Sequence, residues 1–166
     1  MTARIFALIV PVALTISVMH AQTTSGNPFV GSWKVIAADK LLPNGTRVTD
    51  YYGTAPHGLV IFTADGHYTI NIFGDVRTRF AGKDREKGTF DEYRAAQLTS
   101  SCSFGTYSVD TSTHKLTLHT DRSTYPNGDD TTVVRDYELE GDTLSWRVTP
   151  RPDGSVPLTV IRRIAQ

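Results

Sequence analysis

Arg135 is the charged residue whose sequence position most strongly suggests a binding site. It lies in an alternating stretch in which Val133, Tyr137 and Leu139 share its strand face. If that face points inward, a permanent cation enters an apolar interior and needs an anionic partner, either an acidic side chain or the carboxylate of a ligand. The alternative is a strand edge or bulge that turns Arg135 outward into solvent.

A second group with chemical potential lies on the stretch before it, where His119, Asp121 and Ser123 alternate and therefore share one face. They could form a proton-transfer group, because histidine titrates near neutral pH. Leu116 and Leu118 occupy the opposite face of the same stretch and favour the interior, which would leave His119 at the surface. The two placements are open alternatives.

The overall composition limits the classes of protein that these residues can belong to. The chain has 166 residues, 17 Lys and Arg, 17 Asp and Glu, one Cys and 39% hydrophobic residues. This length fits one globular domain, and the balanced charge gives no indication of a nucleic-acid or anionic-membrane partner. One Cys excludes an internal disulfide, and no Cys and His spacing is typical of a zinc site. We expect neither a metal nor a cofactor.

The first 21 residues have the order of a secretory signal peptide. A basic residue, Arg4, is followed by an apolar run over Ile5–Val18 and then by Ala21, after which we expect cleavage. The apolar run contains Pro11 and is too short to span a bilayer comfortably. We therefore expect an exported protein, periplasmic or secreted, with a linker over 22–28, a single domain over 29–166 and no integral membrane segment after cleavage.

The rest of the chain is rich in threonine and valine, whose branched side chains favour strands. Apolar residues alternate with polar ones, as in Leu144, Trp146 and Val148, which predicts strands with one buried and one exposed face. Thr63-Ala64-Asp65-Gly66 is a hairpin signal between two such stretches. We predict eight strands, over Gly31–Ala38, Leu59–Phe62, His67–Phe73, Ser103–Asp110, Lys115–Thr120, Thr131–Glu140, Thr143–Thr149 and Leu158–Ile164.

One segment has helical spacing instead. Thr89 and Glu92 match the capping box, and Phe90, Tyr93 and Ala96 follow at helical intervals, which predicts a short helix over about Phe90–Ser100. The charged stretch 74–88 before it is expected to cross one end of the sheet in contact with solvent.

Several motifs in this order resemble the lipocalin-like domain family over about residues 30–164. They are Gly31-Ser32-Trp33 with Arg163 near the end of the last strand, the run 59–68, Arg79-Phe80-Ala81, Gly105–Asp110 and Arg135–Leu139. The resemblance implies an all-β fold, an eight-stranded antiparallel up-and-down barrel with one short helix near its mouth. It implies no common activity.

Within such a barrel we assign a structural role to Gly31, Trp33 and Arg163. The flat guanidinium can lie over the indole and seal the narrow end of the barrel, with Arg162 as the competing partner. We predict that the interior binds a small, largely apolar molecule, with or without a carboxylate. The predicted ligand-binding residues are Tyr68, Ile70, Tyr107, His119, Arg135, Tyr137 and Trp146.

Two alternatives to a carrier are compatible with the same residues. One is an isomerase- or cyclase-type enzyme that uses Tyr107, His119 and Arg135 on a small hydrophobic metabolite in the cavity. The other is a barrel filled with side chains, since eight strands leave room for one small ligand or for side chains alone.

Overall fold

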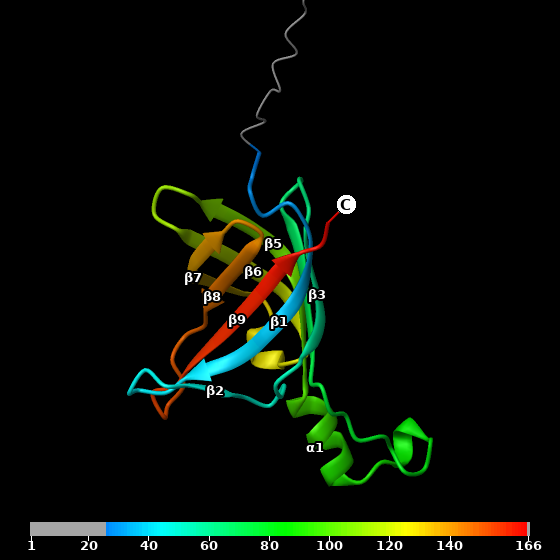
Figure 1. The fold of residues 1–166 in the computed structure, drawn as a ribbon. Helices are drawn as coiled ribbons and strands as arrows, with labels where there is room; N and C mark the ends of the chain where they lie inside the picture. Colours follow the sequence, from blue (N-terminus) through cyan, green and yellow to red (C-terminus); the bar gives the residue numbers. More distant parts are fainter. Residues whose placement is uncertain (1–25, 166) are drawn as a thin grey trace, which may run out of the picture.

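Eight antiparallel strands close into a barrel in the computed structural model, which describes residues 26–165 (Figure 1). The strands pair in the order β2-β1-β3-β4-β5-β6-β7-β8-β9, and β1 also pairs with β9. That last pairing closes the ring, with β2 as a short addition to β1. The predicted all-β lipocalin-like fold is thereby confirmed, whereas the predicted signal peptide lies outside the described residues.

Short turns join β3 to β4, β5 to β6 and β7 to β8, whereas the connection between β4 and β5 is the longest. The strands are β1 (Gly31–Leu41), β2 (Arg47–Thr49), β3 (His57–Phe62), β4 (His67–Phe73), β5 (Ser100–Asp110), β6 (Lys115–Ser123), β7 (Thr131–Glu140), β8 (Thr143–Arg147) and β9 (Val156–Arg163). The helices are η1 (Arg85–Lys87), α1 (Phe90–Leu98) and η2 (Pro126–Gly128). No helix within residues 26–165 has the length and apolar character needed to cross a bilayer.

All eight predicted strands are present and form the closed barrel, and two of them, β4 and β7, have the predicted bounds. Strands β1, β5 and β6 are each three residues longer than predicted, because backbone pairing extends beyond the apolar alternation, at the start of β5 and at the ends of β1 and β6. The sequence analysis missed β2, whose three residues pair only with β1. Gly66 adopts a φ of 88° in the β3–β4 turn, a conformation that the predicted Asp-Gly pair allows.

The predicted helix is present but ends at Leu98. The capping box is formed, because the Thr89 side chain accepts from the Glu92 backbone amide while the Glu92 carboxylate accepts from the Thr89 amide. Thr99 and Ser100 hydroxyls then bond carbonyls of the last turn, and β5 begins at once. The stretch 74–88 projects beyond the barrel with α1 and does not cross over its end (Figure 1).

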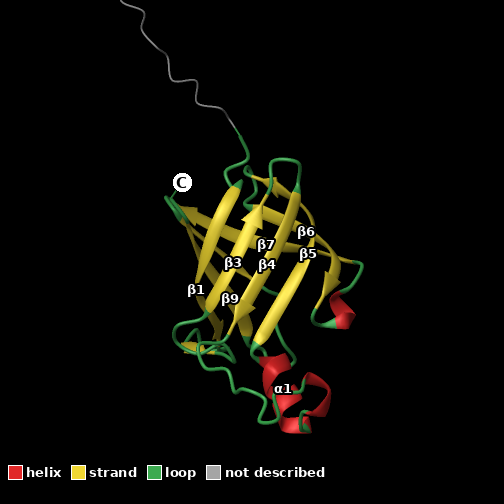
Figure 2. Ribbon diagram, turned by 90° about the vertical axis from the view of Figure 1, so that its right-hand side faces the viewer, coloured by secondary structure: helices red, strands yellow, loops and turns green. Residues whose placement is uncertain are grey.

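The two ends of the barrel differ in how they are filled. One end carries the β3–β4, β5–β6 and β7–β8 turns together with the segment 26–30. The other end carries the longer connections, including α1 and η2, and Figure 2 shows α1 opposite the C-terminal end of the chain. We call the first the closed end and the second the mouth.

Candidate functional site

An internal cavity of about 650 Å³ opens at the mouth. Its apolar lining comes from several strands around the ring and from Val148, which follows β8, and it includes Ala38, Ile70, Ile72, Val133, Trp146, Val148 and Leu158. Its hydroxyl groups include those of Ser101, Ser103, Thr120, Ser123, Thr131 and Thr159. The interior is thus neither filled nor purely apolar, and its volume is within the range typical of small-molecule sites.

Arg135 is the charged side chain that β7 places inside this cavity. Its strand neighbour Tyr137 is buried, and Leu116, the residue opposite Arg135 on β6, is fully buried, so the inward face of β7 carries Arg135. The alternative in which a bulge turns Arg135 outward is therefore wrong.

The Arg135 guanidinium has no hydrogen bond or ion pair with any residue that the structure describes. No fully buried side-chain nitrogen or oxygen among those residues lacks a partner, so the guanidinium nitrogens are open to the cavity. Loss of solvent lowers the pKa of Arg135 from its usual value, but a guanidinium keeps its charge in proteins. The cavity therefore holds an uncompensated cation.

Tyr68 and Thr120 form a polar pair beside this cation. The Tyr68 hydroxyl lies 2.8 Å from Thr120 Oγ1, and Thr120 lines the cavity. Gly105 lies between their strands as the pairing partner of both, and an added Cβ there would lie 2.0 Å from the His119 carbonyl oxygen. The electrostatic interaction with Tyr68 raises the pKa of Arg135, against the larger lowering by loss of solvent. The hydroxyl pair and the guanidinium thus belong to one polar region.

Thr159 adds a free hydroxyl to the opposite wall. It pairs with Trp146 across β8 and β9 and is 7% exposed, yet its hydroxyl has no partner among the described residues. Because no fully buried polar atom of the described residues is unsatisfied, this hydroxyl also faces the cavity.

An ion pair occupies the rim of the mouth. Asp50, whose side chain is 4% exposed, accepts from Arg151 at 2.6 Å and lies 4.0 Å from Lys40. The pair joins the β2–β3 connection to the β8–β9 connection, and both residues line the cavity. Arg151 is therefore already neutralised, which leaves Arg135 as the cavity cation without a described counter-ion.

Three of the predicted ligand-binding residues, Ile70, Arg135 and Trp146, line the cavity directly. Tyr68 reaches it through Thr120. The sequence analysis missed Thr120, Thr159, Asp50 and Arg151. Thr120 could have been found, because it shares the inward strand face of Leu116 and Leu118. No local pattern indicates Asp50 or Arg151, which lie in connections between strands.

Tyr107 and Tyr137 face inward but lie at the closed end, so their prediction as cavity wall is wrong. The Tyr107 hydroxyl donates to the Thr63 carbonyl at 2.9 Å and accepts from Asn27 at 2.9 Å. The Tyr137 ring contacts Phe29, with 4.8 Å between centroids. These rings fill the closed end because the segment 26–30 folds over it.

His119, which was predicted to bind the ligand, is on the outer wall and does not line the cavity. Its side chain is 41% exposed, its Nδ1 lies 3.0 Å from Thr132 Oγ1, and its Nε2 lies 3.7 Å from Asp121 and from Asp130. Leu116 and Leu118 take the interior face of β6, as their spacing indicated. Within residues 26–165, no group of three or more His, Cys, Asp or Glu is arranged to hold a metal.

The closed end is sealed by Trp33 and Arg163. The guanidinium carbon of Arg163 lies 4.1 Å from the Trp33 ring centroid, and Arg162 is exposed on the other face of β9. Gly31 has a φ of 133°, and an added Cβ there would lie 3.2 Å from Arg163 Nη1. Gly31 therefore lets the guanidinium approach the backbone.

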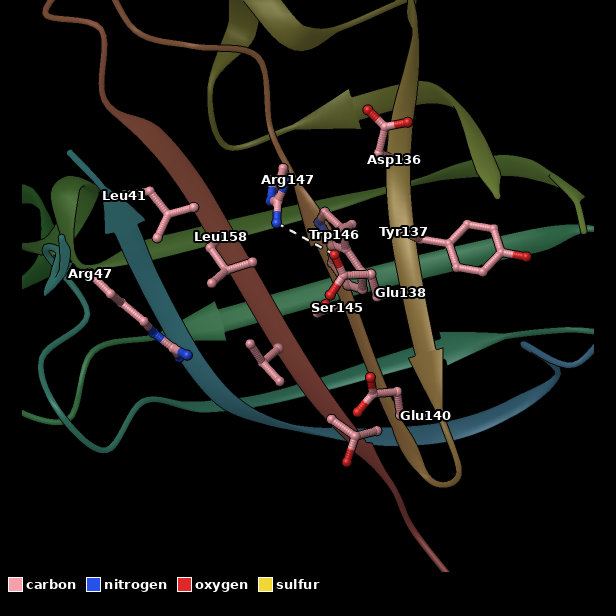
Figure 3. A pocket seen from close by; sticks show the side chains of 12 residues that line it. Leu41, Arg47, Asp136, Tyr137, Glu138, Glu140, Ser145, Trp146, Arg147 and Leu158 are labelled. Carbon is pink, nitrogen blue, oxygen red and sulfur yellow. Dashed lines mark hydrogen bonds and ion pairs between the residues drawn. The ribbon is translucent and has the colours of Figure 1, made fainter. Parts of the chain in front are cut away.

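A second hollow, of about 370 Å³, lies on the outside of β7, β8 and β9 (Figure 3). Outward side chains such as Glu138 and Arg147, joined by an ion pair of 3.4 Å, surround it. Figure 3 shows the Tyr137 ring pointing away from the other side chains of this hollow. Four of its five charged side chains, all but Glu140, are in ion pairs on an exposed wall, so we place the candidate site in the internal cavity.

The model of the lipocalin-like domain matches residues 30–161. The chain belongs to the lipocalin-like domain family. Searches of the curated proteins and of the solved structures found no match. A lipocalin-like barrel suggests small-molecule binding in general, and in this one the open cavity with its free cation is the place where binding can occur.

Proposed function

We propose that this lipocalin-like protein is an exported carrier that binds a small amphipathic molecule, with the carboxylate of the ligand at Arg135. The observation that carries the proposal is the cavity-facing guanidinium without a described counter-ion. A desolvated cation is costly unless an anion joins it, and a planar guanidinium matches a carboxylate through two parallel hydrogen bonds.

The lining supports an amphipathic ligand more than a purely apolar one. Ile70, Ile72 and Trp146 offer an apolar wall for the body of the molecule. The Thr120 and Thr159 hydroxyls offer further donors and acceptors elsewhere on the cavity wall. A ligand with one anionic end and a hydrocarbon or aromatic body can contact both the apolar wall and the polar groups of the cavity.

The geometry gives no support to an enzyme built on Tyr107, His119 and Arg135. Tyr107 is held at the closed end by two hydrogen bonds, and His119 lies on the outer wall. The three side chains therefore do not surround one reacting atom, which acid–base catalysis requires. A carrier returns its ligand unchanged, and this property separates the two classes.

The binding proposal is tested by titrating the protein with dodecanoate and with methyl dodecanoate while Trp146 fluorescence is followed. We expect the acid to bind about tenfold to a hundredfold more tightly, because only the carboxylate receives charged hydrogen bonds. Arg135→Gln should remove the preference and leave weak binding of both compounds. Trp146→Phe identifies the fluorescence change as a signal from the cavity.

His119→Ala and Arg147→Gln serve as controls on the outer wall and should leave both affinities within about twofold. Equal affinity of the parent for acid and ester, or an unchanged preference in Arg135→Gln, would refute the carboxylate site. The absence of any binding by either compound would favour a barrel that acts as a structural module.

Export is tested separately from binding. The intact mass of the protein recovered from its native host should correspond to a chain that begins at Gln22. Recovery of the full-length chain from the cytoplasm would refute this part of the proposal.

A further inference from the structure

The segment 74–99, which we call the arm, is a separately organised extension at the mouth (Figures 1 and 2). Phe80 and Tyr93 pack edge to face with 5.3 Å between ring centroids, and a Cβ on Gly88 would lie 2.4 Å from Phe80. Glu92 joins the two halves, because its carboxylate accepts from the backbone amides of Ala81 and Thr89, each at 2.7 Å. The arm thus has a small interior of its own.

That interior leaves other large apolar side chains in solvent. Phe90 is 79% exposed at the first position of α1, and Val76 is 77% exposed. The last turn of α1 joins β5 at the rim, so Phe90 begins the end of the helix that is farther from the barrel. None of the residues of α1 is buried. The folding of the arm itself does not account for these exposed groups.

In the arm, most carboxylates point toward the backbone of the protein, whereas most cations point into solvent. Three carboxylates are partly buried and turned toward backbone amides: Asp75 accepts from Thr54 and Ala55, Asp84 from Glu86, and Glu92 as described above. The exposed carboxylates among the described side chains are Glu86 and Asp91. The exposed cations are Arg77, Arg79, Lys83, Lys87 and Arg94, of which only Lys87 has a carboxylate partner among the described residues, Asp84 at 3.4 Å. The outward surface of the arm is therefore basic.

We propose that the arm docks on an anionic phospholipid surface, with Phe90 entering the interface and the exposed cations facing the head groups. Basic residues near an anionic bilayer and an aromatic side chain at its boundary are both stabilised there. Docking in this way would bring the mouth of the cavity toward the lipid, since the arm and the mouth share one end of the barrel. The proposal does not depend on what the cavity binds.

The balanced net charge of the whole chain gave no indication of such a partner, because it averages over opposite faces. The outer wall of β6 and β7, with the loop between them, carries the exposed carboxylates Asp121, Asp130 and Glu138, the last of them paired with Arg147. A second copy of the chain could place this acidic wall against the arm. The combination of exposed Phe90 with cations favours lipid, because an acidic protein wall offers no apolar medium to the ring.

The test is sedimentation of the ligand-free protein with phosphatidylglycerol vesicles and with phosphatidylcholine vesicles. We expect binding to the anionic vesicles only, weakened by added salt. Arg79→Gln with Arg94→Gln should lower the partition coefficient about 25-fold, at about fivefold for each cation. Phe90→Ala should lower it about tenfold.

Matched controls change the same residue types on the barrel wall. Arg122→Gln with Arg147→Gln, and Phe104→Ala, alter exposed residues outside the arm and should retain parental binding within about twofold. Equal binding to both lipids, or an equal loss in the control pair, would refute the docking proposal. Arm-dependent dimers in light scattering without vesicle binding would also refute it and indicate a second copy as the partner.

Discussion

The guanidinium of Arg163 lies over the indole of Trp33, 4.1 Å from its centroid, while its two terminal nitrogens donate to the carbonyls of Val30 and Pro28 at 2.9 and 2.6 Å. The Trp33 Nε1 donates in turn to the Phe29 carbonyl at 2.8 Å. One arginine thus holds the last strand, the first strand and the segment that covers the closed end.

Trp33→Ala should lower the free energy of unfolding by about 3–5 kcal/mol, because it leaves a void among buried side chains. Arg163→Ala should be coupled to it by about 0.5–3 kcal/mol in a double-mutant cycle followed by urea unfolding. Arg162→Ala, an exposed neighbour, should show no coupling with Trp33→Ala. Additive effects of the Trp33 and Arg163 variants would contradict an energetic role for the stacking.

Arg135→Met should raise the stability of the ligand-free protein while it removes preferential binding of acids. The substitution replaces an unpaired cavity cation by an apolar side chain of similar length, and we expect a gain of about 1–2 kcal/mol. Thermal unfolding without and with dodecanoate measures both effects. A loss of stability in the ligand-free variant would indicate that the guanidinium has a structural role.

Gly105→Ala should be strongly destabilising, because an added Cβ would lie 2.0 Å from the His119 carbonyl oxygen at the β5–β6 bulge. We expect a cost of about 1–3 kcal/mol from the backbone shift. Gly82→Ala is the control, since no atom lies within 4 Å of the Cβ built there. Similar urea midpoints for the two variants would contradict the proposed tight approach.

Asp110 gives a pH-dependent contribution whose direction follows from its hydrogen bonds. Ser112 and Thr113 donate to its carboxylate and lower its pKa from 3.8 to about 2. Its contribution is therefore present above about pH 4 and is lost as the pH falls toward 2. The parent should be more stable than Asp110→Asn near neutral pH, and the difference should shrink over that acidic range.

Unfolding curves at several pH values test this prediction for Asp110. Ser112→Ala removes a donor to the carboxylate and should shift the loss to higher pH. A difference between parent and Asp110→Asn that is independent of pH would contradict it.

Local patterns predicted the elements of the barrel because their causes are local. Tyr68, Ile70 and Ile72 alternate with polar residues, and successive side chains of a strand must point to opposite faces. The helix start was predictable from Thr89 and Glu92, since a capping box is closed by residues three apart. The outward position of His119 was likewise predictable, because it follows Leu118 on the strand and therefore points to the opposite face.

Depth within the barrel and contacts between distant loops were decided by the tertiary structure alone. Tyr107 and Trp146 both alternate inward, but the segment 26–30 covers one end and makes Tyr107 part of the seal, whereas Trp146 lines the cavity. Asp50 and Arg151 meet across 101 positions of sequence. The choice of Arg163 over Arg162 required the pairing of β9 with β1, because a shift of one residue exchanges the faces of a strand.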